Sequence, residues 1–261
     1  MGTVRTGYSE HIAYLTLDRP EARNALSTQM CSDVVAALDE IDNHLRARVV
    51  IVEGEGRIFC SGADFAAVSG PAGLEFLPAF ESMLARLDRF RLPTIARIQG
   101  AAMGGGLQLA TACDFRLAAE DATLGIPSSR LGIVVNYENV QRLVLVAGLA
   151  VAKEVLMTAR SYSAAEAAEA GLVTRVCPAA DLLAITRQMA EDIAMLAPLG
   201  VQGAKRSLIA VGDRLAAPRD LRVTASFDEI DGLVAAAYRS ADLQEGISAM
   251  GQKRAPRFEG R

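Results

Sequence analysis

The stretch AAMGGGLQLATACDF, residues 101–115, decides how the middle of this chain folds. Three consecutive glycines, Gly104 to Gly106, lead directly into an apolar segment whose pattern predicts a helix. Glycine lets the backbone approach a ligand closely and adopt dihedral angles that other residues avoid. The start of a helix presents unpaired N–H groups and a partial positive charge. The stretch therefore predicts either a tight strand-to-helix turn or a turn that also holds a developing negative charge.

The apolar pattern around this stretch predicts an α/β fold. Helices are expected after a cap at Ser27, over residues 79–90, after the glycines, and through most of the chain beyond Asn136. The stretch 66–78, which contains glycine and proline, predicts an irregular connection. Strands are expected where apolar runs end at glycine or proline, in HIAYLTLDRP (11–20), RVVIVEGEG (48–56), RIFCSGADF (57–65), LPTIARIQG (92–100) and ACDFRLAAEDATLGIP (112–127).

Composition limits the class of protein. The 261 residues carry a net charge of −4 and are 51% hydrophobic, which is enough for one large domain or a domain with an appendage. Basic residues are scattered, which argues against a nucleic-acid partner. The sequence contains no apolar run of membrane-spanning length and begins without a signal-peptide pattern, so a cytoplasmic protein is expected.

Cysteine and histidine usage argues against a metal site. The four cysteines are widely spaced and form no CxxC pair, and the chain has two histidines. Zinc sites need clustered ligands, so no metal is expected and the thiols are expected to be reduced. A Ser-His-Asp hydrolase is poorly supported as well, because the sequence contains no G-x-S-x-G elbow.

Five segments of the sequence together resemble the crotonase, or enoyl-CoA hydratase/isomerase, superfamily. They occur in the family's order and at family-like spacings: RPEARNAL (19–26), FCSGADF (59–65), LPTIARIQGAAMGGGLQLATACDFRLA (92–118), SAAEAAEAGLVTRV (163–176) and DLQEGISAMGQKRAPRF (242–258). The resemblance implies a crotonase-like β-β-α spiral core over residues 1–199 and a C-terminal helical trimerisation region over 200–261. It also implies an acyl-CoA ligand, no cofactor besides the coenzyme A thioester, and a homotrimer or hexamer.

The shared chemistry of this family is stabilisation of a thioester enolate by two backbone N–H groups. By motif match these groups belong to Ala63, in Ser-Gly-Ala-Asp, and to Gly105, the middle glycine. Preorganised donors of this kind contribute about 2.7–4 kcal/mol each in a well-studied case. Alone, each residue would be interpreted as an ordinary turn residue, so the assignment depends on the two motifs occurring together.

The resemblance also suggests where coenzyme A is bound. Matched positions place Arg23 and Ala25 near the nucleotide, and Cys60 and Ala63 along the adenine and pantetheine path. Lys253 resembles a tail lysine that many members extend to the nucleotide phosphates, although a solvated tail charge is an equal alternative. A lysine that is often found after the Gly-Ala-Asp motif is Ala66 in this sequence.

Two substitutions depart from the ordinary hydratases of the family. Those enzymes use two glutamates around one water, and the matching positions here carry Gln108 and Ser128. A general base must have an accessible pKa, which an amide and a hydroxyl lack. General acid–base catalysis contributes roughly 10²–10⁴ in rate, so ordinary hydration is expected to be weak or absent.

The segment GIVVNYENVQRL also departs, because Asn136, Tyr137, Glu138 and Asn139 replace the glycine-rich pattern of many members. In some isomerases of the family a single carboxylate comes from this segment. Glu138 is a candidate, but an acid in the first turn of a helix more often serves the helix dipole. Tyr137 could donate a hydrogen bond or wall the acyl pocket, since an unperturbed tyrosine stays protonated at neutral pH.

Three functions therefore remain open. The chain could isomerise or decarboxylate an acyl-CoA, relying on the two N–H groups. It could instead bind acyl-CoA without turning it over. Fold alone does not decide between these alternatives.

Overall fold

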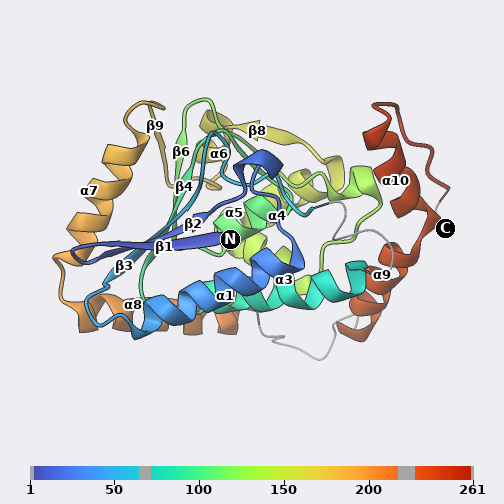
Figure 1. The fold of residues 1–261 in the computed structure, drawn as a ribbon. Helices are drawn as coiled ribbons and strands as arrows, with labels where there is room; N and C mark the ends of the chain where they lie inside the picture. Colours follow the sequence, from blue (N-terminus) through green and yellow to red (C-terminus); the bar gives the residue numbers. More distant parts are fainter. Residues whose placement is uncertain (1–2, 65–71, 217–226, 260–261) are drawn as a thin grey trace.

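The computed structural model describes residues 3–64, 72–216 and 227–259 (Figure 1). A six-stranded sheet forms the centre, in the order β1-β2-β3-β4-β6-β9. Its strands are β1 (Val4–Ser9), β2 (Ile12–Leu17), β3 (Val49–Gly54), β4 (Thr94–Ile98), β6 (Phe115–Ala119) and β9 (Arg175–Cys177). The pair β1–β2 is antiparallel, and every later neighbour pairs in parallel.

A second sheet explains the repeated pattern of the chain. It contains β5 (Ala101–Met103), β7 (Thr123–Gly125) and β8 (Ser161–Ser163) in that order. The chain passes from β4 in the large sheet to β5 in the small one and then into α4, and from β6 to β7 and then into η2 and α5. The predicted crotonase-like β-β-α spiral is therefore confirmed.

The helices begin where the sequence places capping residues. The Ser27 hydroxyl accepts a hydrogen bond from the Met30 N–H at 3.2 Å, and Ser163 forms a capping box with Glu166. The helices are η1 (Pro20–Ala22), α1 (Thr28–Asn43), α3 (Ala72–Asp88), α4 (Gly105–Thr111), η2 (Ser128–Leu131), α5 (Tyr137–Thr158), α6 (Ala164–Glu169), α7 (Leu182–Ala194), α8 (Pro198–Ala216), α9 (Phe227–Arg239) and α10 (Ala241–Gly251).

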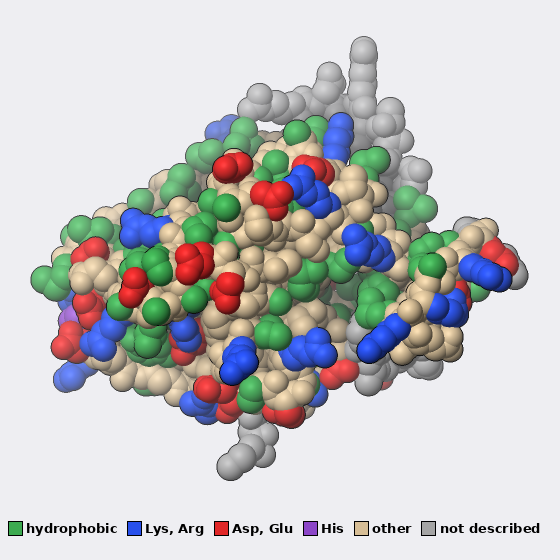
Figure 2. Space-filling model, turned by 90° about the horizontal axis from the view of Figure 1, so that it is seen from above, with side chains coloured by type: hydrophobic (Ala, Val, Ile, Leu, Met, Phe, Trp, Pro, Cys, Tyr) green, Lys and Arg blue, Asp and Glu red, His purple; other side chains and the backbone are tan. Residues whose placement is uncertain are grey.

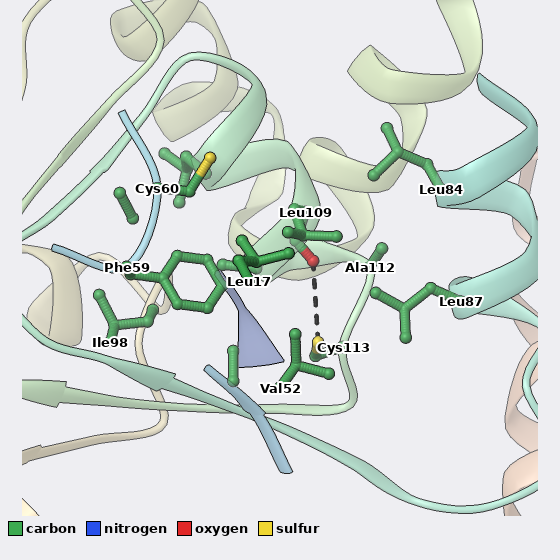
Figure 3. Packing of buried hydrophobic residues seen from close by; sticks show 14 of the residues in the cluster. Leu17, Val52, Phe59, Cys60, Leu84, Leu87, Ile98, Leu109, Ala112 and Cys113 are labelled. Atoms are coloured by element: carbon green, nitrogen blue, oxygen red, sulfur yellow. Dashed lines mark hydrogen bonds between the residues drawn. The ribbon is translucent and has the colours of Figure 1, made fainter. Parts of the chain in front are cut away.

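The central strands are buried on both faces, as their continuous apolar runs predict. In β3, Val50 and Val52 join the main core with α1 and α3, whereas Val49 and Ile51 pack toward α7 on the other side. The main core also contains Leu17, Phe59, Leu84, Leu109 and Cys113 (Figure 3). Side chains therefore pack against both faces of the central sheet, and this packing holds the strands in place.

Three local predictions differ from the structure. The strand expected over 57–65 is reduced to isolated bridges at Cys60 and Ala63, because this segment pairs with single residues only, Ala102 of β5 and Leu26. The connection expected over 66–78 is helical from Ala72, with Pro78 inside α3. A proline removes only one helical N–H donor, and the apolar face of α3 packs into the core. The short strands β1 and β8 were not anticipated.

The C-terminal helices cover one end of the molecule (Figure 1). Helix α10 packs tightly on η2, since a Cβ on Gly246 would lie 2.7 Å from the Cα of Leu131. The domain boundary expected near residue 200 stays a prediction. Within the described ranges, no helix is long and apolar enough to cross a membrane.

Candidate active site

The N–H of Ala63 is directed away from the strand pair in which this residue takes part. Ala63 forms an isolated parallel bridge with Leu26. The hydrogen bonds of this bridge run from Leu26 N to the Gly62 oxygen and from Asp64 N to the Leu26 oxygen, both at 2.8 Å. The bridge therefore uses the groups on either side of Ala63 and leaves its own N–H on the opposite edge.

The N–H of Gly105 is the first of α4 and has no partner inside that helix. Gly104 precedes it with φ of +54°, and its own N–H donates to the Gly125 oxygen at 2.7 Å. Such a turn is open to glycine at little cost. Among the backbone hydrogen bonds of the described residues, none has Ala63 N or Gly105 N as its donor.

The two loops lie side by side. Gly62 has φ of +109°, and a Cβ placed on it would lie 2.9 Å from the Met103 oxygen and 3.6 Å from the Gly105 nitrogen. A Cβ on Gly106 would overlap with the Cys60 carbonyl oxygen. The glycines thus let the two backbones approach, and this approach brings the N–H groups of Ala63 and Gly105 into one region.

The predicted coenzyme A residues fall into two groups. The segment 23–26 runs beside 60–64, because Ser61 N donates to the Arg23 oxygen at 3.1 Å in addition to the bonds of Leu26. Arg23 is exposed, whereas Ala25 and Cys60 are buried. Lys253 lies exposed just beyond α10, and its place near the nucleotide stays a prediction. Ala66 lies outside the described residues.

The Cys60 side chain is not suited to nucleophilic chemistry. Its thiol is fully buried, and burial raises the pKa to about 12. A thiol of this kind stays protonated at neutral pH and acts as a small apolar side chain.

Gln108 and Ser128 are placed differently. Gln108 lies on α4 one turn after Gly105, its side chain is buried, and its amide oxygen has no hydrogen-bond partner within the described part of the chain. Ser128 begins η2 and is half-buried. Neither position carries a carboxyl group.

The segment 136–139 contains two buried amide side chains, those of Asn136 and Asn139, and one exposed acid, Glu138. Asn136 caps α5, accepting a hydrogen bond from Asn139 N at 3.3 Å, and its amide nitrogen donates to Glu81 Oε1 at 2.7 Å. Glu138 is exposed in the first turn of α5, as the helix-dipole interpretation predicts. Tyr137 is half-buried.

The sequence interpretation missed Glu81. Its partner Asn136 lies 55 residues further along the chain, and no local motif connects them. The pair was not deducible from spacing, because the contact depends on how α3 and the start of α5 pack. The signal that could have drawn attention is a glutamate among the apolar residues of α3.

A cavity of about 1090 Å³ opens between α3, α5 and α8. Its walls include Glu81, Asn136, Glu138 and Thr111, the last residue of α4. The residues of the two loops, Ala63 and Gly105, are not among its walls. The cavity therefore adjoins α4 at the end opposite to the one at which the glycine run begins.

The face shown in Figure 2 carries charges of both signs, with acidic and basic side chains spread over it. Within the described ranges, no group of three or more His, Cys, Asp or Glu residues could hold a metal ion.

Comparison with known proteins agrees with this geometry. A family model described as enoyl-CoA hydratase/isomerase matches residues 7–261. The enoyl-CoA isomerase/hydratase fer4 of Mycosarcoma maydis is 34% identical over 263 residues, covering 96% of this chain and 93% of the relative. An enoyl-CoA hydratase/carnithine racemase from Magnetospirillum magneticum is 31% identical with a TM-score of 0.78, covering 100% and 97% of the two chains.

A methylmalonyl-CoA decarboxylase is also similar. Its structure in complex with 2-nitronate-propionyl-CoA has a TM-score of 0.88 and 26% identity, covering 99% of each chain. The similarity extends over both the sheet core and the C-terminal helices, because so little of either chain is left uncovered.

Proposed function

Because the chain belongs to the enoyl-CoA hydratase/isomerase family, we propose that it binds an acyl-CoA thioester and stabilises the thioester enolate with the N–H groups of Ala63 and Gly105. The observation that carries this proposal is the close approach of the two loops. Both N–H groups lack a backbone acceptor in the described structure, so they can donate to a developing oxyanion.

Hydration by a pair of glutamates does not fit this site. Gln108 and Ser128 hold the two positions, and neither side chain takes up a proton near neutral pH. The amide oxygen of Gln108 is buried and has no hydrogen-bond partner among the described residues, so it can accept a hydrogen bond from a bound ligand. The proposed chemistry therefore begins at the enolate and does not require addition of water.

The reaction that we favour is isomerisation of a 3-enoyl thioester to the 2-enoyl thioester. A base removes a proton from C2, the electron pair moves onto the thioester oxygen, and a proton is returned at C4. The two N–H groups stabilise the dienolate between these steps. One carboxyl group is enough for both transfers, whereas hydration requires the pair that is missing.

Decarboxylation of a malonyl-type thioester is a second candidate. The observation that favours it is the TM-score of 0.88 with a methylmalonyl-CoA decarboxylase. Loss of carbon dioxide leaves its electron pair on the same thioester oxygen, and a proton is then added at C2. This route needs the oxyanion donors but no base at its start.

The proposed assembly is a homotrimer or hexamer. Apolar side chains are exposed along α8, where Leu199, Leu208 and Leu215 are 87%, 70% and 60% exposed. Exposed apolar surface of this kind marks an interface between proteins. We propose that copies of the chain cover it, with Lys253 near the coenzyme A.

A substrate panel tests the proposed reaction. The protein is incubated with a 3-enoyl-CoA, methylmalonyl-CoA and crotonyl-CoA, and binding by calorimetry is measured beside turnover. We expect the 3-enoyl-CoA to be isomerised, and crotonyl-CoA hydration to be at least 10²-fold slower, as the loss of general acid–base catalysis requires. Hydration at rates of about 1–10³ s⁻¹ would contradict the proposal. If the protein binds these thioesters but turns over none of them, the proposed reaction is wrong and the chain is a non-catalytic acyl-CoA-binding protein.

A further inference from the structure

We propose that Glu81 on α3 carries the proton in this isomerisation, and that Asn136 positions its carboxyl group. The inference rests on the proposed enolate chemistry and names the base that this chemistry requires. Glu81 belongs to α3, and Asn136, which is hydrogen-bonded to it, is the residue that caps the start of α5. The positions used by hydratases of the family contribute no carboxyl group to it.

Consecutive residues of α3 connect this carboxyl group with the glycine loop. A Cβ on Gly105 would lie 3.3 Å from the ring of Phe80, so Phe80 packs directly on the residue that supplies an oxyanion donor. Glu81 is the next residue, and it lines the cavity beside Asn136. The residue that carries the carboxyl group is therefore adjacent in α3 to one that packs on the oxyanion loop, and the proposal places C2 to C4 of the acyl chain between that loop and Glu81.

The amide of Asn136 has a single orientation. Its oxygen is committed to the cap of α5, where it accepts from Asn139 N, so its NH₂ group must face Glu81. Asn136 is 5% exposed, so water has little access to its amide group and does not compete with Glu81 for its N–H donor. A buried, oriented donor fixes the carboxyl group of Glu81 in one place and leaves its second oxygen available.

The charges around Glu81 make it a stronger base than a free glutamate. Burial raises its pKa, the negative charges of Glu138 and Asp231 raise it further, and the Asn136 hydrogen bond lowers it. Tyr238 of α9 faces the same group, and burial together with the Glu81 charge raises the pKa of Tyr238 to about 12. Tyr238 therefore stays protonated and does not compete as a base.

The cations that line the cavity are engaged with partners other than Glu81. Three lie within ion-pair distance of another carboxylate: Arg89 with Asp213 at 2.8 Å, Arg142 with Asp88 at 3.5 Å, and Lys205 with Asp114 at 2.7 Å. The fourth, Arg116, donates to the backbone oxygens of Leu172 at 2.9 Å and Cys113 at 2.6 Å. No described cation is thus bonded to Glu81, and its carboxylate keeps the basicity that burial gives it.

The proton transfer balances at this residue. The Glu81 carboxylate takes a proton from C2 of the 3-enoyl thioester, and the C–H electron pair moves through the thioester carbonyl onto oxygen. The electrons return, the double bond forms between C2 and C3, and the Glu81 carboxylic acid gives its proton to C4. Glu81 ends as the carboxylate, and no other reactant is consumed.

Glu81→Gln tests the proposal without removing the structural bond. The glutamine oxygen still accepts from Asn136, so α3 and α5 remain connected, but the side chain no longer takes up a proton. We expect kcat for the 3-enoyl-CoA to fall by roughly 10²–10⁴. The Kd of the acyl-CoA should change less than about threefold, because the oxyanion donors are untouched. Glu75→Gln, an exposed change on the same helix, is the matched control.

Asn136→Ser tests the positioning role. Serine still caps α5, but it is too short to keep the hydrogen bond with Glu81. Loss of a donor to the carboxylate raises the pKa of Glu81, so the acidic limb of the kcat/KM profile should move to higher pH. A purely structural role would lower activity without moving this limb.

The outcomes separate this inference from the proposed function. If the parent protein isomerises the 3-enoyl-CoA and folded Glu81→Gln retains more than a third of its kcat, Glu81 is not the base and the proposed function stands. The same holds if Glu138→Gln removes the activity while Glu81→Gln does not. If the parent binds the thioester but turns over none of the panel, the proposed reaction fails and Glu81 as its base fails with it.

Discussion

Gly105 combines a donor with a lack of side chain. Its N–H begins α4, and a Cβ in its place would lie 3.2–3.4 Å from Leu26 and Phe80. The residue therefore determines both the electrostatics of the loop and how closely α3 approaches it. A test at Gly105 therefore needs one substitution that removes the N–H donor and another that only adds a side chain.

Gly105→Pro removes the donor at a position where proline is tolerated, the first residue of a helix. Binding of an acyl-CoA analogue with enolate-like negative charge should weaken about 10²-fold, as loss of one oxyanion donor implies. Free coenzyme A should bind nearly as before. Gly105→Ala keeps the N–H and adds only the Cβ, so it is the control for crowding, and calorimetry measures both ligands. Equal weakening of the two ligands by Gly105→Pro would make the glycine purely structural.

At the residue scale, the sequence motifs are sufficient to pair Ala63 with Gly105, because each carries a recognisable local pattern. The structure brings these two loops side by side, although their roles remain predictions. The contact between Glu81 and Asn136 has no local pattern and arises only when two helices pack. A site that depends on tertiary contacts of this kind cannot be predicted from local sequence motifs.

At the scale of elements, prediction succeeds where burial is uniform. The strand β3 and the start of helix α1 were expected close to where they are observed, since a continuous apolar run and a serine cap are local signals. The prediction of a strand over 57–65 was wrong, because the segment forms only single bridges with residues distant in the chain or in β5. The start of α3 was wrong for a related reason, since packing of its apolar face outweighs the local preference of Pro78.

Helix α8 is attached to the core by one buried cation. Lys205 is 6% exposed, and its Nζ donates to the Leu92 oxygen at 2.9 Å and to Asp114 Oδ2 at 2.7 Å. The same carboxylate accepts from the Thr94 N–H and hydroxyl, which connects α8 with the start of β4. The attachment therefore combines this buried polar cluster with the exposed ion pair between Arg89 and Asp213 of α8, whose atoms lie 2.8 Å apart.

Lys205→Met should lower the free energy of unfolding by about 3 kcal/mol, because it leaves Asp114 with an uncompensated charge. This value is the lower end for a buried pair, since Asp114 is 28% exposed. Urea unfolding at one fixed protein concentration measures the change, with the exposed Lys153→Met as control. A loss no greater than that of Lys153→Met would show that the buried cluster around Lys205 does not contribute to holding α8.

At the scale of the molecule, the exposed leucines of α8 predict self-association. Light scattering at micromolar concentration should give the mass of a trimer or hexamer of the 27.6 kDa chain. Leu208→Glu places a charge on the 70%-exposed position and should shift the population toward monomer without unfolding it. Glu169→Gln, on helix α6, is a control away from α8. A monomeric parent protein would contradict the predicted assembly.

The packing of α10 on η2 has a consequence for the order in which the protein becomes complete during translation. Residues 128–131 are synthesised about halfway through the chain, but the helix that covers them is made of residues 241–251. The sheet strands up to β9 leave the ribosome earlier and fold as a unit. The 3-10 helix η2, which begins at Ser128, therefore stays uncovered until translation is nearly finished. A nascent chain arrested before residue 241 is expected to hold the folded sheet and the glycine loops while η2 still lacks the helix that covers it.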